Sequence, residues 1–126
     1  MSDSIPTLVR ALVAAQARST KTSEARLALP AGSSRARVTT ANARWMRASE
    51  ERDRREAALR AALERACVPE LAELHKVASA QIEVAHWAFT RQARAVPPSV
   101  AVPGAYALRS AIDNVIRERG GEVVGG

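Results

Sequence analysis

The stretch "SSRARVTTANARWMRASEERDRREAALRAALERA", residues 33–66, has the most uniform character in the chain. It contains nine arginines and neither glycine nor proline, the two residues that most often end a helix. Ser33 or Ser34 is suited to cap its N-terminus with a hydroxyl oxygen. We therefore expect one helix over residues 35–67, which would be about 50 Å long at the usual helical rise.

The apolar side chains of this helix follow a heptad-like seam that is interrupted in the middle. The seam positions recur at alternating three- and four-residue steps: Val38, Ala41, Trp45, Ala48, Arg52, Arg55, Leu59, Ala62 and Ala66. The central segment "SEERDRRE", residues 49–56, has no apolar residue, and it pairs Glu50 with Arg54 and Glu51 with Arg55 at i,i+4 spacing. We expect these central turns to be exposed to solvent or to meet a polar partner.

A second long helix is expected over residues 69–95, because Pro69 breaks the first one. Its apolar face consists of Leu71, Leu74, Ala78, Ile82, Ala85 and Phe89. A short turn between two long helices favours antiparallel packing. The predicted fold class is therefore all-α, with a long, coiled-coil-like antiparallel helical hairpin over residues 35–95 and short N-terminal and C-terminal helices.

The flanking segments complete a single helical domain over residues 1–126. Residues 1–34 are expected to form a basic N-terminal helix, from about residue 4 to 18, and a linker with a helical turn near residues 24–29 that Pro30 and Gly32 end. Residues 96–126 contain a proline-rich connector, a short helix and a tail. Four apolar side chains of that last helix are expected to face inward: Leu108, Ile112, Val115 and Ile116.

The composition predicts a thin hydrophobic core. Of the 59 apolar residues among 126, 27 are alanine, which buries little surface. We therefore expect self-association to extend the core, so that the chain forms a homo-oligomer. The residues expected at the oligomer or partner interface are Trp45, Leu59, Leu63, Ile82 and Phe89. The abundance of alanine and of arginine over lysine, 17 to 2, is typical of a GC-rich bacterial or phage coding sequence.

The charge is distributed unevenly along the chain. Residues 1–48 carry eight basic side chains against two acidic ones, so the whole net charge of +6 lies there, whereas residues 49–126 carry eleven of each sign. Such asymmetry points to an anionic partner, either DNA or RNA or an acidic protein surface. Only Trp45 could stack on a base among these arginines, which favours contacts to the phosphate backbone over base readout. The expected nucleic-acid-binding residues are Arg35, Arg37, Arg44, Arg47, Arg54 and Arg55.

A helix-turn-helix motif is an alternative use of the basic region, with residues 35–47 as the recognition helix. The connection from Arg18 is long, and the usual three- to four-residue turn containing glycine is absent. The basic residues are therefore better explained as a stripe that tracks phosphates.

Catalytic and metal-binding signatures are scarce. Glu83 and His86 form one Glu-x-x-His pair, but a carboxylate-bridged metal site needs two, and His75 belongs to no such motif. The single Cys67 excludes a disulfide within the chain, and we interpret it as a small buried residue rather than a nucleophile. We expect no catalytic residues, no metal and no cofactor.

The N-terminal segment does not read as a signal peptide, because Asp3 precedes the apolar run and Arg10 interrupts it. No stretch is apolar enough to span a membrane, so the expected location is the cytoplasm or an assembled phage particle, without membrane contact. Two non-catalytic functions remain open. One is binding of the nucleic-acid backbone through the basic N-terminal part; the other is a helical assembly or adaptor protein, such as a virion component or a protein-docking inhibitor.

Overall fold

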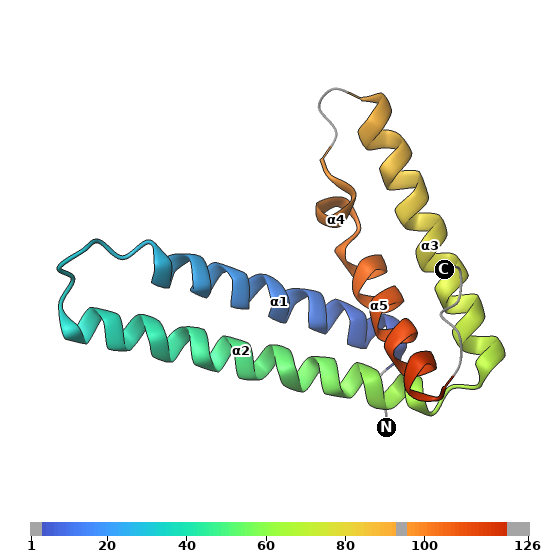
Figure 1. Cartoon of the computed structure of the whole chain (residues 1–126), viewed down its shortest axis with the longest axis horizontal. Coiled ribbons are helices and arrows are strands. Elements are labelled where there is room, and N and C mark those ends of the chain that lie inside the picture. Colours follow the sequence, from blue (N-terminus) through green and yellow to red (C-terminus); the bar gives the residue numbers. More distant parts are fainter. Residues whose placement is uncertain (1–3, 93–95, 121–126) are drawn as a thin grey trace.

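The structure, a computed structural model of the chain, describes residues 4–92 and 96–120. Within these residues the protein has helices and no strand, which confirms the all-α fold class. The helices are α1 (Ile5–Leu27), α2 (Arg35–Glu64), α3 (Val68–Arg91), α4 (Pro98–Ala101) and α5 (Pro103–Glu118). Figure 1 shows two arms: α1 and α2 lie side by side in one, α3 to α5 form the other, and the arms meet where α1 begins and α2 ends.

The first arm is an antiparallel hairpin that local signals delimit. Ser4 caps α1 by accepting a hydrogen bond from the backbone N–H of Thr7 at 3.4 Å. The chain then reverses over residues 28–34, where Gly32 adopts φ +84°, a left-handed conformation that favours glycine. Ser34 caps α2 by accepting from the N–H of Arg37 at 3.3 Å. These signals place the two helices on either side of one chain reversal.

The pairing of the helices differs from the predicted one. The hairpin expected over residues 35–95 does not form; α2 packs along α1, and α3 leaves the end of α2 to pack on α5 and α4. The physical reason is the distribution of large apolar side chains. The polar segment 49–56 of α2 offers the apolar face of α3 nothing to bury against, whereas α5 supplies Ile112, which lies in one buried cluster with Leu71 of α3.

The α1 helix is longer than expected and includes most of the predicted linker. It continues past Arg18 to Leu27 because its second half lies against α2, where Ser19 is buried and Thr22 and Arg26 are half-buried. The connector after α3 also differs from the prediction, since residues 98–101 form the one-turn helix α4. The second long helix ends at Arg91, before the predicted residue 95, because the backbone of Gln92 is extended. The tail after residue 120 lies outside the described residues.

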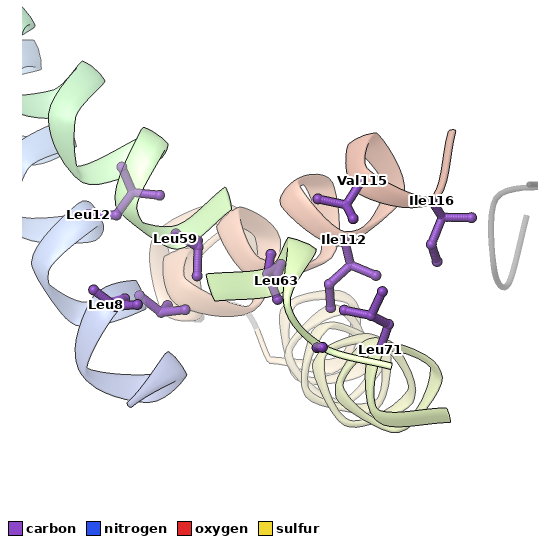
Figure 2. Packing of buried hydrophobic residues seen from close by; sticks show 10 residues of the cluster. Leu8, Leu12, Leu59, Leu63, Leu71, Ile112, Val115 and Ile116 are labelled. Atoms are coloured by element: carbon purple, nitrogen blue, oxygen red, sulfur yellow. The ribbon is translucent and has the colours of Figure 1, made fainter. Parts of the chain in front are cut away.

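The main hydrophobic core lies at the junction of the two arms (Figure 2). Leucines from α1 and α2 pack there against the C-terminal half of α5 and the start of α3. The buried members are Leu8, Val9, Leu12, Leu59, Leu63, Ala66, Leu71, Ile112, Val115 and Ile116. Three of the four predicted inward residues of the last helix, Ile112, Val115 and Ile116, are buried as expected, and Leu108 packs against the cluster while half-buried.

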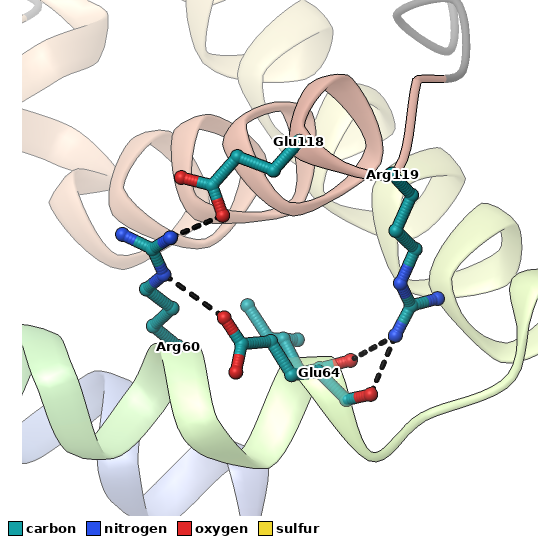
Figure 3. Close-up of polar contacts among 5 residues, drawn as sticks. Arg60, Glu64, Glu118 and Arg119 are labelled. Atoms are coloured by element: carbon teal, nitrogen blue, oxygen red, sulfur yellow. Dashed lines mark hydrogen bonds and ion pairs between the residues drawn. The ribbon is translucent and has the colours of Figure 1, made fainter.

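Polar contacts fix the end of α2 against α5 (Figure 3). Arg119 donates from Nη2 to the carbonyl oxygens of Glu64 at 2.5 Å and Ala66 at 3.3 Å, which satisfies carbonyls that the end of a helix leaves without partners. Arg60 bridges Glu64 of its own helix and Glu118 of α5. The chain therefore turns sharply after α2 and lets α3 run in a new direction.

The second arm is held by a smaller apolar cluster and one buried polar pair. Ala78 and Ile82 of α3 pack against Ala105 of α5. Nε2 of the buried His75 lies 3.0 Å from Oδ1 of Asp113 on α5, within ion-pair distance, and neither atom forms a hydrogen bond with a described residue. This pair therefore links α3 to α5 across an otherwise apolar contact.

Candidate nucleic-acid interface

The structure gathers the basic residues of the chain at the far end of the α1–α2 hairpin. Residues 18–47, here called the basic tip, comprise the second half of α1, the turn and the first half of α2. They carry seven basic side chains and one acidic side chain, so the tip holds a net charge of +6 and the rest of the chain sums to zero. The basic members are Arg18, Lys21, Arg26, Arg35, Arg37, Arg44 and Arg47.

The packing of the basic tip relies on small and polar side chains. Ala48, which directly follows the tip, is buried. The hydroxyl groups of Ser19 and Ser49 lie 3.5 Å apart between the two helices. Farther out, the guanidinium of Arg26 lies over the ring of Trp45, 4.1 Å from its centroid. Trp45, which we expected at a partner interface, is half-buried in this contact and thereby joins α1 to α2.

A shallow groove of about 530 Å³ runs between the two helices of the basic tip. Its floor is made mostly of small and apolar side chains, among them Ala25, Leu29 and Ala41. Lys21 on α1 and Arg37 and Arg44 on α2 stand around it. Cations from both helices therefore border one groove.

Four of the six arginines predicted to bind nucleic acid lie in the basic tip with their side chains available. Arg35, Arg37, Arg44 and Arg47 are exposed, and none forms an ion pair with a described residue. Arg37 and Arg44 are two turns apart on the same face, about 10 Å along the helix axis. These four side chains can meet an anion without first giving up a protein partner.

The other two predicted arginines lie outside the basic tip and are already paired. Arg54 and Arg55 donate to the two carboxylate oxygens of Glu51, at 2.6 Å and 2.7 Å. Hydrogen bonds from Arg54 and then Arg55 hold the pKa of Glu51 below its ordinary value, so this carboxylate stays ionised and offsets one of their two charges. The structure thus divides the predicted stripe into an unpaired part and a paired part.

Sequence reasoning missed the contribution of α1 to this surface. The sequence predicts Arg18 at the end of the N-terminal helix and Lys21 in the linker, so neither is expected beside the arginines of α2. In the structure α1 runs on through both residues, and Lys21 borders the same groove as Arg37 and Arg44. Their i,i+3 spacing places both side chains on one helix face, but no local pattern shows that this face lies beside α2.

The residues predicted at an oligomer or partner interface lie mostly inside the chain's own core. Leu59 and Leu63 are fully buried between α1 and α5, and Ile82 is buried against α5. A partner cannot reach these three side chains while the fold is intact. Phe89 is different, since it remains 42% exposed near the end of α3.

The helix-turn-helix alternative does not fit the geometry. That motif sets two helices at a steep angle across a turn of three or four residues. Here α1 and α2 run antiparallel side by side, and seven residues, 28–34, connect them.

A second hollow lies between the two arms, and its lining is more acidic than that of the groove. Its volume is about 790 Å³, and Asp53, Glu56, Tyr106 and Asn114 are among the residues that line it. Two carboxylates in its wall disfavour phosphate there. The basic tip is therefore the better candidate for contact with an anionic polymer.

The sequence predicted the surroundings of the histidines and the cysteine only in part. His75 is buried with Asp113, and Ser79 Oγ lies 3.4 Å from its Nδ1, whereas Glu83 and His86 are exposed on α3. Cys67, expected to be buried, is exposed as a free thiol because it lies just before the first turn of α3. Within residues 4–92 and 96–120, no three His, Cys, Asp or Glu side chains converge as a metal site would require.

In the part of the chain that the structure describes, no helix is both long and apolar enough to cross a membrane. Comparison with protein-family models, with curated proteins and with solved structures gives no match.

Proposed function

We propose that this protein binds the phosphate backbone of a nucleic acid through its basic tip. The observation that carries the proposal is the location of the net charge: all of it lies on residues 18–47, at the end of the hairpin away from the core. Such a concentration of one sign of charge attracts a polyanion and orients it toward the tip.

The side chains of the basic tip suit backbone contact. A guanidinium group binds two phosphate oxygens at once, and Arg37 and Arg44 present two such groups along one face of α2. Lys21 adds a third cation from α1 across the groove. The three together can follow a phosphate chain that lies along the groove between the helices.

Base recognition is not supported by the same surface. Trp45 is the one aromatic residue of the basic tip, and Arg26 covers its ring. Stacking on bases, which single-strand binders use, therefore has no exposed platform there. We expect binding to depend strongly on salt and only weakly on sequence.

The second candidate function is docking onto an acidic protein surface. The observation that favours it is the apolar floor of the groove, since Leu29, Ala36 and Ala41 line it together with the cations. An amphipathic acidic helix would bury its apolar side chains in this groove and pair its carboxylates with the basic rim. Phosphate backbone alone makes no use of the apolar floor.

The proposal is tested by fluorescence anisotropy with labelled duplex DNA, single-stranded DNA and RNA, over about 50 to 300 mM salt. We expect binding whose log–log salt slope is roughly −3 to −6, as displacement of several counterions requires. The double variant Arg37→Gln/Arg44→Gln should reduce that slope by about two, because it removes two phosphate contacts.

The matched control is Arg54→Gln/Arg55→Gln, which lowers the net charge by the same amount outside the basic tip. It should change the slope little, since these two arginines are paired with Glu51. Equal reductions of the salt slope in both variants would mean that binding depends on the net charge of the whole chain and not on the basic tip. Absence of binding to all three ligands at the lowest salt would reject the proposal and leave the acidic protein surface as the better candidate.

A further inference from the structure

The α3 helix has a second apolar face that no other described element of the chain covers. Only Arg91 of α3 itself lies over the ring of Trp87, 5.9 Å from its centroid. One face carries the buried Leu71, Ala78 and Ile82, which pack on α5 or in the junction core. The opposite side carries Val77, Val84 and Trp87, which are 50%, 68% and 57% exposed. Figure 1 shows α3 at the outer edge of the second arm.

The spacing of this exposed face is that of a helix–helix seam. Val77, Ala80, Val84 and Trp87 recur at steps of three, four and three residues, which places them in one stripe along about three turns of α3. Single exposed apolar residues are ordinary on protein surfaces. A stripe with seam spacing that includes a tryptophan is typical of an interface.

We propose that this stripe pairs, antiparallel, with the same stripe of a second copy of the chain. In the register that sets Ala80 opposite Val84 of the second copy, Val77 faces Trp87 of that copy. The twofold symmetry repeats both contacts. In each of them a smaller side chain, Ala80 or Val77, meets a larger one, Val84 or Trp87. The interface is isologous, as a twofold dimer requires.

Charge complementarity selects the second copy and the antiparallel direction. The seam continues to Glu73 at one end and Arg91 at the other, and neither forms an ion pair with a described residue of its own chain. In the proposed register Glu73 of each copy faces Arg91 of the other. A parallel arrangement would instead set glutamate against glutamate and arginine against arginine.

One like-charge contact is built into the same register. Glu83 flanks the seam close to the twofold axis, where it approaches Glu83 of the second copy. The proposal therefore predicts one position at which removing a charge strengthens the dimer. The basic tip lies on the other arm and is not part of this interface, so the inference is independent of the proposed function.

The test is sedimentation velocity on the full chain over a range of concentrations, with pairs of charge variants. Glu73→Arg and Arg91→Glu should each weaken self-association by roughly 10-fold, because each turns both end pairs into like charges. An equimolar mixture of the two variants should form a heterodimer as strong as the wild-type dimer, since all end pairs are then opposite in sign. Glu83→Gln should strengthen self-association.

A variant within the seam supplies the independent check. Val84→Glu places a carboxylate against apolar side chains and should weaken the dimer by about 100-fold or more, whereas Val38→Glu, at a half-exposed position on α2, should leave it unchanged. Both positions are at the surface, and circular dichroism verifies that helicity is retained. The inference is overturned if the wild-type chain is monomeric at all concentrations, or if the mixture of charge variants associates no better than each variant alone.

Discussion

The α1–α2 hairpin has two ends: a base, where it joins the rest of the chain, and the basic tip. The same two helices pack against each other at both ends, but through different kinds of side chain. At the base, Leu8 and Leu12 of α1 pack against Leu59 and Leu63 of α2, and α5 covers them. At the basic tip the contact between the helices consists of small and polar groups and of Arg26 over Trp45. The base buries four leucines, and the tip buries none.

This difference explains how one hairpin can be both a scaffold and a charged surface. Burial of apolar area supplies most of the stability of a fold, so the base fixes the position of both helices. The helical segments of the tip, residues 18–27 and 35–47, are so short that they would be marginal alone in water. The tip is therefore held mainly by its continuity with the base and by a few contacts. Because the tip has little core to protect, unpaired arginines are tolerated there.

The largest expected effect is on the base. Leu63→Ala should lower the free energy of unfolding by about 3 to 5 kcal/mol, because it leaves a cavity among leucines that are fully buried. Urea denaturation followed by circular dichroism measures the change. Val38→Ala, in the basic tip and 38% exposed, is the matched truncation and should cost less than about 0.5 kcal/mol. Similar losses for the two variants would contradict the division between base and tip.

An intermediate effect is expected where the second arm joins the first. His75→Leu removes the partner of the Asp113 carboxylate in a buried contact and should destabilise the fold by about 1 to 3 kcal/mol. His75→Gln keeps a hydrogen-bond donor and should lose less. Thermal unfolding of the two variants checks this order, and equal loss would show that the size of the side chain matters there rather than its polar contact with Asp113.

The smallest effect is expected at the basic tip. Trp45→Ala removes the surface on which Arg26 rests and should destabilise the tip locally by about 1 kcal/mol. Hydrogen exchange should become faster within residues 18–47, while the amides of the base keep their protection. Met46→Ala, one position along and 54% exposed, is the control and should change neither region. Faster exchange throughout the chain after Trp45→Ala would mean that tip and base unfold together.

The sequence predicted individual helices better than their pairing, and the reason is physical. Caps and breakers are local, so Ser34 and Pro69 placed the boundaries of α2 and α3 to within a few residues. Periodicity showed that Leu59 lies on the apolar side of its helix. It did not say which helix supplies the other side, because α1 and α3 both offer apolar stripes of the same spacing.

The sequence predicts that the candidate site is basic, but it does not predict which residues form it. The exposed arginines of α2 could be read from their helical positions, and the pair of Glu51 with Arg55 was visible at i,i+4 spacing. The structure shows that Glu51 also holds Arg54, which removes both arginines from the unpaired set. Lys21 joins the surface only because α1 folds back along α2, and no local pattern specifies that contact.

Hydrogen exchange with and without nucleic acid tests the central claim most directly, because it compares base and tip in one experiment. In the free protein, amides of residues 18–47 should exchange faster than those of the buried segments near Leu12, Leu59 and Ile112. Addition of DNA or RNA should protect residues 18–47 and leave the base and the second arm unchanged. Protection gained on α3 or α5 with no change in the basic tip would contradict the account.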